Sequence, residues 1–425
     1  MNIIFISPNY PAGHRKYVAA LRRAGHDVLG IGDAGEETFA PELRGCLSAY
    51  YRVGDLHDYD SVYRACCYYV WQHGRIEAIE SLNPYWRDLV SSLRSEVCAA
   101  PNCPEKEYVR LAGNDMACAE LTPRVKCATP KKACALAAQY GYPLLAVPAE
   151  NKRLGSRLIV ADAGVKSLLR GSTKGEYVFA AAPEGEPLSV DGLALGGKLV
   201  ACAAHQRSEE SQSVVCVAVD GLEARCQSLI DELRFVDGFF HIEAVRLTSA
   251  AAGLGKKGAV CFVAFEETPP HEYIIDLMSM EFGCDLRRTW AEKRVVMLRE
   301  EPCTAWSEGA DGSAGEQPGQ ESTLPSEPAL PLERECFAAA AWRSFERSYK
   351  NLHEKVLRKL ASKLSFHGRT EEPDRWAYSD YVYLFGGETA AELRRGVKFI
   401  TEDHPLPKKP EIEEAKAPTE ETSAE

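Results

Sequence analysis

The sequence contains no Cys-x-x-Cys pair, although it has fifteen cysteines. The spacings among Cys98, Cys103, Cys118, Cys127 and Cys134 match no local zinc-binding pattern. This absence argues against a zinc finger and against a dithiol redox motif. We interpret the cysteines as small hydrophobic residues of a protein that folds in a reducing compartment.

Long hydrophobic runs are also missing from the sequence. A membrane-spanning helix needs roughly 18 or more apolar residues, and no stretch approaches that length. The first residues, Met1 to Ser7, lack the basic region that precedes the apolar part of a secretory signal. We therefore expect a cytoplasmic protein that does not enter a membrane.

The chain has no excess of positive charge, because 50 lysines and arginines face 62 aspartates and glutamates, a net charge of −12. Residues 307–335 hold seven acids against Arg334 alone, and residues 404–425 hold six acids against three lysines, so these segments carry nine of the twelve net charges. The remainder is nearly balanced and offers no basic surface for phosphate backbones or anionic lipids. We expect neither a nucleic acid nor a membrane surface as partner.

What is present is a globular composition, with 45% hydrophobic and 26% charged residues in a chain of 425. That length predicts two to four domains. The start reads as a strand (3–6), an amphipathic helix (about 14–24) and a second strand (28–31), followed by a helix (59–73) and a strand (76–80). This βαβ order predicts a doubly wound α/β domain over residues 1–104.

The pattern changes to α+β over residues 105–306, where antiparallel strands are expected. A helix (130–140) precedes a strand (144–147), and further elements are predicted at 177–182, 188–195, 199–204, 214–219, 239–247 and 260–265, with a helix at 222–235. Residues 253–258 are rich in glycine and join two of these strands, so we interpret them as a hairpin loop.

The last third of the chain divides by composition. Residues 307–335 are rich in Gly, Ser, Pro and Glu and predict a disordered linker or insertion. Residues 336–403 predict a small α/β piece with a strand (336–342), a helix (345–364), a strand (381–385) and a helix (389–400). Residues 404–425 predict a disordered tail.

Three stretches in combination resemble bacterial ATP-grasp proteins, and in particular the carboxylate–amine-ligase-like relatives of the carbamoyl-phosphate synthase large subunit. The stretches are Phe5–Asn9 with Val28–Asp33, Ile79–Ser81 with Tyr85–Trp86, and Phe240–Glu243 with Gly253–Gly258. The resemblance covers about residues 1–300 and resumes over 336–403. It implies a pre-ATP-grasp domain over 1–104 and an ATP-grasp-like domain over 105–306.

The resemblance also implies a chemistry and its cofactors. ATP-grasp ligases use ATP and Mg²⁺ to activate a small-molecule carboxylate as an acyl phosphate, which an amine then attacks. Glu243 stands where the family keeps a metal-binding carboxylate, and Glu266 replaces a neighbouring asparagine. The resemblance therefore implies a divalent metal between Glu243 and Glu266.

Other family positions have lost their charge. Val147 stands where the family has a lysine for the nucleotide phosphates, and Ala264 and Thr268 replace a glutamate and an arginine. Lys152 and Arg153, in the following loop, are candidates to supply the missing cation to ATP. The resemblance thus implies a degenerate nucleotide site.

Polar residues that follow the N-terminal strands are candidates for substrate binding. Ser7, Asn9 and Asn83 lie where ligands of open α/β sheets gather, although the same residue types are ordinary in loops. His241 is interpreted as a packed strand residue rather than a ligand. No local pattern indicates nucleophilic catalysis, so no catalytic residue is assigned.

Three functions remain open at this point. The favoured one is an inactive or weakly active ATP-grasp relative that acts as a binding or regulatory subunit, beside an intact ATP-grasp ligase or as a homo-oligomer. The alternative is an active ATP-dependent carboxylate–amine ligase that uses substitute residues. The third is a structural partner that binds no small molecule.

Overall fold

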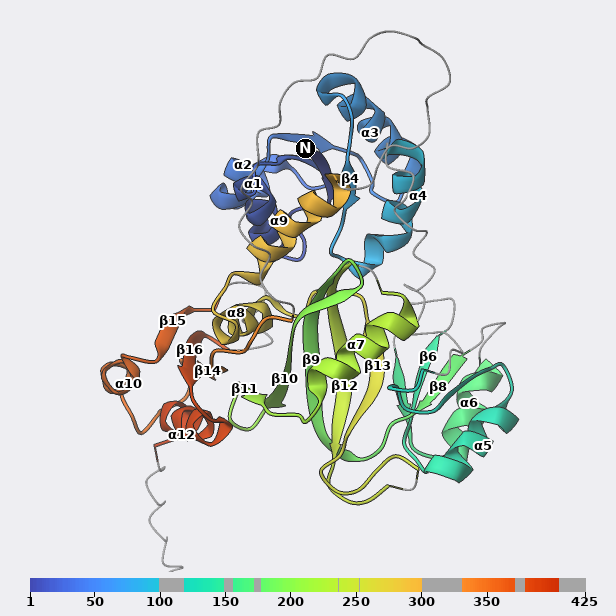
Figure 1. Cartoon of the computed structure of the whole chain (residues 1–425), viewed down its shortest axis with the longest axis vertical. Helices are drawn as coiled ribbons and strands as arrows, with labels where there is room; N and C mark the ends of the chain where they lie inside the picture. The colour runs from blue at the N-terminus through green and yellow to red at the C-terminus, as the bar shows by residue number, and fades with distance from the viewer. Residues whose placement is uncertain are drawn as a thin grey trace, which may run out of the picture.

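The computed structural model describes residues 1–98, 118–148, 156–171, 177–235, 237–251, 253–299, 331–370 and 379–404. These residues form three β-sheets with helices packed against them (Figure 1). The segments predicted to be disordered, over 307–335 and 404–425, lie almost entirely outside the described residues. Within the described part of the chain, every helix is too short or too polar to cross a bilayer.

The N-terminal sheet consists of four parallel strands in the order β3-β2-β1-β4. Ile3 and Phe5 of β1 pack on one face, and Ile4 and Ile6 pack on the other. Both faces are apolar because both are covered by helices. This is the doubly wound arrangement predicted from the sequence. Its elements are β1 (Asn2–Ile6), α1 (His14–Arg23), β2 (Asp27–Gly32), α2 (Pro41–Cys46), β3 (Ala49–Arg52), α3 (Tyr59–His73), β4 (Ala78–Glu80) and α4 (Arg87–Val97).

The large sheet has eight antiparallel strands in the order β13-β12-β9-β10-β11-β14-β16-β15. One face is covered by α7 (Leu222–Leu233), and the other by α8 (Glu272–Glu281) and α9 (Leu286–Arg299). Its strands are β9 (Gly185–Leu195), β10 (Lys198–Ser208), β11 (Ser213–Val217), β12 (Gly238–Leu247), β13 (Val260–Glu266), β14 (Phe337–Arg343), β15 (Leu364–Arg369) and β16 (Tyr381–Gly387). The glycine-rich residues between β12 and β13 join two antiparallel neighbours, which confirms the predicted hairpin.

The C-terminal strands β14 to β16 complete this sheet, and α10 (His353–Leu360) and α12 (Ala390–Thr401) pack on it. The predicted helix over 345–364 is wrong at both ends. The helix begins only at His353 and ends at Leu360, and Leu364 already belongs to β15, which pairs with β16. Pairing with a neighbouring strand outweighs the local apolar periodicity here.

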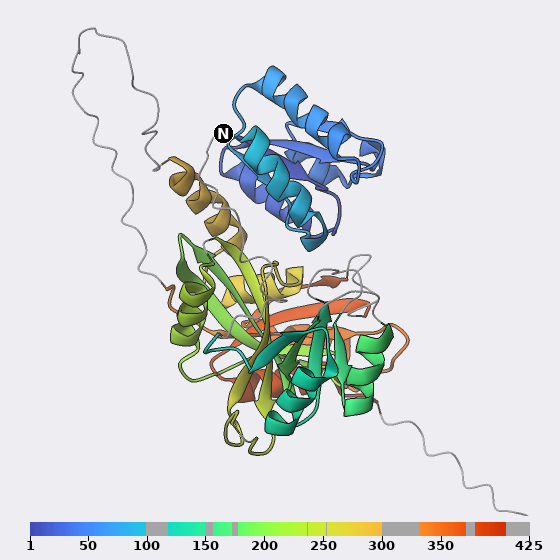
Figure 2. The same ribbon diagram turned by 90° about the vertical axis from the view of Figure 1, so that its right-hand side faces the viewer.

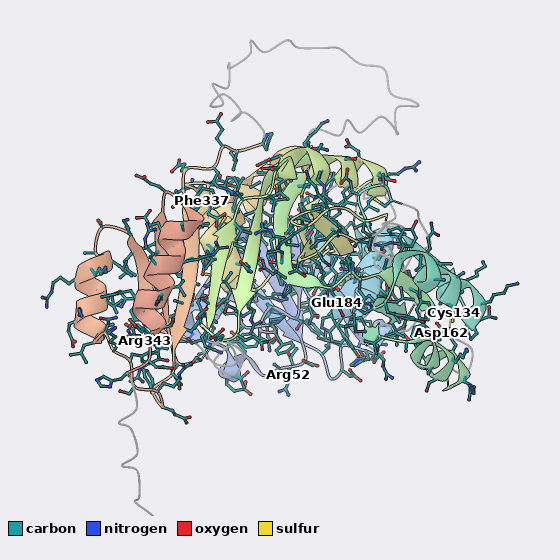
Figure 3. All side chains as sticks on the ribbon, turned by 90° about the horizontal axis from the view of Figure 1, so that it is seen from below. Arg52, Cys134, Asp162, Glu184, Phe337 and Arg343 are labelled. Carbon is teal, nitrogen blue, oxygen red and sulfur yellow. The ribbon has the colours of Figure 1, made fainter. Side chains whose placement is uncertain are left out.

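The small sheet has the antiparallel order β5-β8-β6-β7 and carries two helices on one face. Cys134 of α5 and Asp162 of α6 lie side by side there, far from Phe337 and Arg343 at the ends of β14 (Figure 3). The elements are β5 (Arg124–Cys127), α5 (Pro130–Tyr140), β6 (Leu144–Pro148), β7 (Arg157–Ile159), α6 (Asp162–Gly171) and β8 (Tyr177–Ala181).

One apolar core joins the large sheet to the N-terminal sheet. Tyr17 of α1 packs edge to face against Phe239 of β12 and Trp290 of α9. Figure 2 shows α9 extending from the large sheet toward the N-terminal domain. The N-terminal sheet and the large sheet therefore share one core through α1 and α9.

Candidate functional site

The candidate site begins with the register of three neighbouring strands of the large sheet. His241 of β12 lies opposite Asp191 of β9 and Glu266 of β13, and Glu243 lies opposite Ser189 and Ala264. Side chains that are paired across strands, or two residues apart, share a face. All six therefore project from one face, and the opposite face of β12 packs against α7.

Glu243 and Glu266 are diagonal neighbours on that face, as the register places Glu266 opposite His241. Partial burial raises the pKa of Glu243, and the negative charge of Glu266 raises it further. Within the described residues, neither carboxylate forms an ion pair. The charge of His241 acts on both carboxylates, and two carboxylates on adjacent strands have the oxygen chemistry that Mg²⁺ and Mn²⁺ prefer.

Asp191 is the centre of a buried polar network beside these carboxylates. Its side chain is fully buried and accepts hydrogen bonds from Ser189 Oγ at 2.6 Å and from His241 Nδ1 at 2.7 Å. His205 Nδ1 of β10 lies 3.4 Å from Oδ2 of Asp191, the oxygen that also accepts from Ser189. Burial opposes the charge on Asp191, but His241 and His205 outweigh it and hold its pKa well below the usual range.

His241 belongs to this network and also lines an open cavity. Burial lowers its pKa, but the charge of Asp191 and the hydrogen bond to it raise the value to about 8. Its side chain is 28% exposed. The cavity has a volume of about 390 Å³, and its polar lining includes Ser189, Asp191, His205, His241, Thr268 and His271.

The small sheet packs against β13, the edge strand of the large sheet, and its face on that side is called the small-sheet wall. Val147 of β6 lies opposite Val178 of β8, and Val178 lies opposite Lys126 of β5, so the three share a face. That face meets the large sheet through an apolar cluster that contains Leu145, Ala180, Val263 and Ala264, with Val147 packed against it. Apart from Lys126 and Arg124, the described side chains of this wall are apolar.

Sequence comparisons find no matching family model and no curated relative. Solved structures do match over nearly the whole chain. The L-amino acid ligase from Bacillus licheniformis superposes with a TM-score of 0.60 at 11% identity, and covers 93% of this chain and 96% of its own. The phosphoribosylglycinamide synthetase from Anaerococcus prevotii gives a TM-score of 0.57 at 8% identity, with 94% and 97% covered. The N5-carboxyaminoimidazole synthetase from Staphylococcus aureus gives 0.54 at 13%, with 94% and 97% covered.

The chain has the ATP-grasp fold. At these identities the likeness establishes the fold and leaves the reaction open. The cavity beside His241 and the adjoining face of β12 and β13, which carries Glu243 and Glu266, are together called the cleft. The charged residues of this chain gather on the large-sheet wall, and the small-sheet wall is mostly apolar.

Of the loops that hold the predicted substrate residues, the loop of Asn83 contacts the end of β13. Arg87, which follows the loop of Asn83, donates a hydrogen bond to the carbonyl oxygen of Glu267, just after β13. Asn83 Oδ1 accepts a hydrogen bond from the backbone of Tyr85 at 3.0 Å. The loop therefore reaches the cleft, while the amide oxygen of Asn83 serves its own turn.

Ser7 has a structural task that the sequence did not reveal. Its backbone is left-handed, with φ of 55°, and its hydroxyl donates to the carbonyl of Tyr10 at 3.2 Å. Its own carbonyl accepts from His14 Nδ1 at 3.3 Å. Asn9 is half-buried in the same loop, and Lys152 and Arg153 lie outside the described residues.

Asp191 and His205 were not identified as site residues from the sequence, and His241 was interpreted there as a packed strand residue. Asp191 and His205 are separated by 14 residues, and His205 lies 76 residues from its other partner, Glu281. One signal was available, because Asp191 and His205 each place an ionisable side chain within an otherwise apolar strand. A buried charge in such a strand requires a partner.

Proposed function

We propose that this chain is an inactive or weakly active relative of ATP-dependent carboxylate–amine ligases. It binds a small-molecule carboxylate and acts as a binding or regulatory subunit in the cytoplasm. Its partner is an intact ATP-grasp ligase or a second copy of the chain. The observation that carries the proposal is the apolar contact between the walls, in which Val147 and Ala264 belong to one cluster.

That contact bears on nucleotide affinity because phosphates need positive charge or hydrogen-bond donors. The S. aureus synthetase has been crystallised with ADP, so a fold of this kind holds a nucleotide there. Each charge-assisted hydrogen bond contributes roughly 1.5–3 kcal/mol. Replacing a lysine by Val147 and an arginine by Thr268 removes two of them, and about 1.4 kcal/mol corresponds to a tenfold change in affinity.

The metal end of the cleft supports residual cation binding. Glu243 and Glu266 offer hard oxygen ligands, and Mg²⁺ commonly takes one or two carboxylates and completes its shell with water and phosphate oxygens. When firmly held phosphates are missing, two carboxylates alone support an affinity in the millimolar range. Their mutual repulsion, which raises the pKa of Glu243, is relieved when a cation binds.

A second candidate is the active ligase, and a specific geometry favours it. Asp191 orients His241 through Nδ1, so Nε2 is directed away from this bond, and in the neutral form of His241, which dominates above its pKa of about 8, Nε2 can accept a proton from an attacking amine. Lys126 shares the small-sheet face with Val147, and Lys152 or Arg153 would add charge from the loop. ATP, when bound, would supply the phosphoryl group that activates the carboxylate.

Calorimetric titration of the full chain with ATP–Mg²⁺ separates the candidates. We expect no micromolar binding by the unmodified chain and a gain of tenfold or more for Val147→Lys combined with Thr268→Arg. Val160→Lys is the matched control, because Val160 is 70% exposed and lies outside the cleft. A micromolar dissociation constant for the unmodified chain contradicts the proposal.

Turnover is measured separately as ADP release with mixtures of carboxylates and amines. Release that is lost in Lys152→Ala or Arg153→Ala establishes the active ligase instead. For the metal, Mn²⁺ is expected to broaden methyl signals near both glutamates, and Glu243→Gln is expected to abolish the broadening. Glu184→Gln, an exposed residue, is the control.

A further inference from the structure

A second group of potential metal ligands lies between the large sheet and α8, on the same face of the sheet as Asp191 and His241. His205 of β10 lies directly opposite Cys216 of β11, and Glu281 is the last residue of α8. One ligand atom from each of the three lies within 4.8 Å of the others, and all three residues are buried. None of the three belongs to the Glu243–Glu266 pair.

The distances suit a single ion. His205 Nε2 lies 3.3 Å from Glu281 Oε1. Two ligands bound tetrahedrally to Zn²⁺, at roughly 2.0–2.2 Å each, are about 3.3–3.4 Å apart. Only the thiol of Cys216 has to approach, and by at most about 1.3 Å, because the ligand atoms lie within 4.8 Å of one another and a bound sulfur lies roughly 3.5 Å from a ligand nitrogen.

Neighbouring charged residues contact two of the three ligands, as is common in metal sites. Histidine ligands of metals commonly donate their other ring nitrogen to a carboxylate. Here His205 Nδ1 lies 3.4 Å from the carboxylate of the fully buried Asp191. Arg334 Nε lies 4.0 Å from Glu281 Oε2, and Arg334 is anchored by the carbonyl of Cys202.

One oxygen of the group has a charged neighbour but no hydrogen bond. Glu281 Oε2 is buried, and Arg334 Nε, 4.0 Å away, is too distant to donate to it. A cation bound to this carboxylate would add to that long contact. This observation is independent of the spacing of the three ligands.

We propose that His205 Nε2, Cys216 Sγ and Glu281 Oε1 bind one borderline-soft divalent cation of the Zn²⁺ type. A ligand set of one nitrogen, one sulfur and one oxygen favours such an ion over Mg²⁺, because Mg²⁺ prefers oxygen alone. His205 lines the cavity beside His241, whereas Cys216 and Glu281 are fully buried, so an ion would reach this closed site past the His205 side chain. Three protein ligands leave one position of a tetrahedral ion for a water molecule.

Titration of the full chain with Co²⁺ tests the site, because a cobalt–thiolate bond gives a charge-transfer absorption that carboxylate ligation does not. We expect one Co²⁺ per chain, displaced by Zn²⁺. Cys216→Ser is expected to abolish the thiolate band, and His205→Gln is expected to weaken binding at least tenfold. Cys127→Ser, a buried cysteine of the small sheet, is the control for binding by the other cysteines.

Loss of the band in Cys127→Ser but not in Cys216→Ser would place the metal elsewhere and overturn the proposal, as would the absence of any band. Folding of each variant is checked by thermal unfolding. If Cys216→Ser does not fold, proton release by the unmodified chain decides. Calorimetry in buffers of different ionisation enthalpy should detect at least one proton per metal, released from the Cys216 thiol, and release of none overturns the proposal.

Discussion

Two buried histidines, one in the N-terminal domain and one in the large sheet, respond to burial in opposite ways. His14 is 4% exposed, and burial lowers its pKa to about 4, with the carbonyl of Ser7 as its hydrogen-bond partner. His205 is 1% exposed, yet Glu281 and Asp191 outweigh the effect of burial and raise its pKa to about 9. The same side chain is neutral in one place and charged in the other.

The two regions therefore stabilise their buried histidines in different ways. In the N-terminal domain, His14 is held by a backbone carbonyl and packs edge to face on Phe5, so it can stay neutral. In the large sheet, Asp191 and Glu281 supply full negative charges to the histidines. The first arrangement keeps the core neutral, whereas the second assembles charges beside the cleft.

The largest effect is expected from breaking the charged arrangement with Asp191→Asn. This change keeps the shape but removes the charge that faces His205 and His241. Removing one partner of a buried ion pair costs about 3–5 kcal/mol of unfolding free energy. Urea unfolding measures the loss, and Asp220→Asn, at an exposed position, should change the value by less than about 0.5 kcal/mol. Equal effects of the two substitutions would mean that the network does not hold the sheet.

A pH effect of about 3 kcal/mol is expected from His14. Its folded-state pKa of about 4 lies below the ordinary value of 6.5, so the unfolded chain binds the proton first as the pH falls. The stability is therefore complete above pH 6.5 and declines as the pH approaches 4. Unfolding of the native chain and of His14→Gln should be compared at both pH values.

The native chain should lose about 3 kcal/mol more than His14→Gln over that interval, since glutamine does not titrate. Parallel profiles for the two proteins would show that His14 binds its proton in the folded state. In that case the contrast with His205 would disappear.

The smallest effect on the free energy of unfolding is expected for an ion pair whose side chains are exposed to solvent. Arg288 donates to Glu292 at 2.6 Å on α9, and the two side chains are 66% and 48% exposed. Exposed pairs of this spacing contribute about 0.3–0.5 kcal/mol. Glu292→Gln should therefore change the urea midpoint only slightly. If it lowered the free energy of unfolding as much as Asp191→Asn does, burial would not explain the large contribution of the charges in the large sheet.

The sequence by itself determined most of the local structure. Helices at Tyr59–His73 and Pro130–Tyr140 were predicted from apolar periodicity, and the structure places Asp58 as the N-cap of the first and Pro130 at the start of the second. The doubly wound domain follows from the βαβ order. The helix expected over 345–364 failed because β15 pairs with β16, and such a long-range pairing leaves little trace in local periodicity.

Only the tertiary structure decided the site. Asp191, His205, His241 and Glu281 come from β9, β10, β12 and α8, and strand register and helix packing bring them together. Cys216 joins them because β11 pairs with β10, although no cysteine spacing in the sequence indicates a metal. Propensity and periodicity act over a few residues, whereas burial and the field of neighbouring charges depend on the whole fold. The sequence therefore determined which residues are available, and the fold decided which of them share a cavity and which carry a charge.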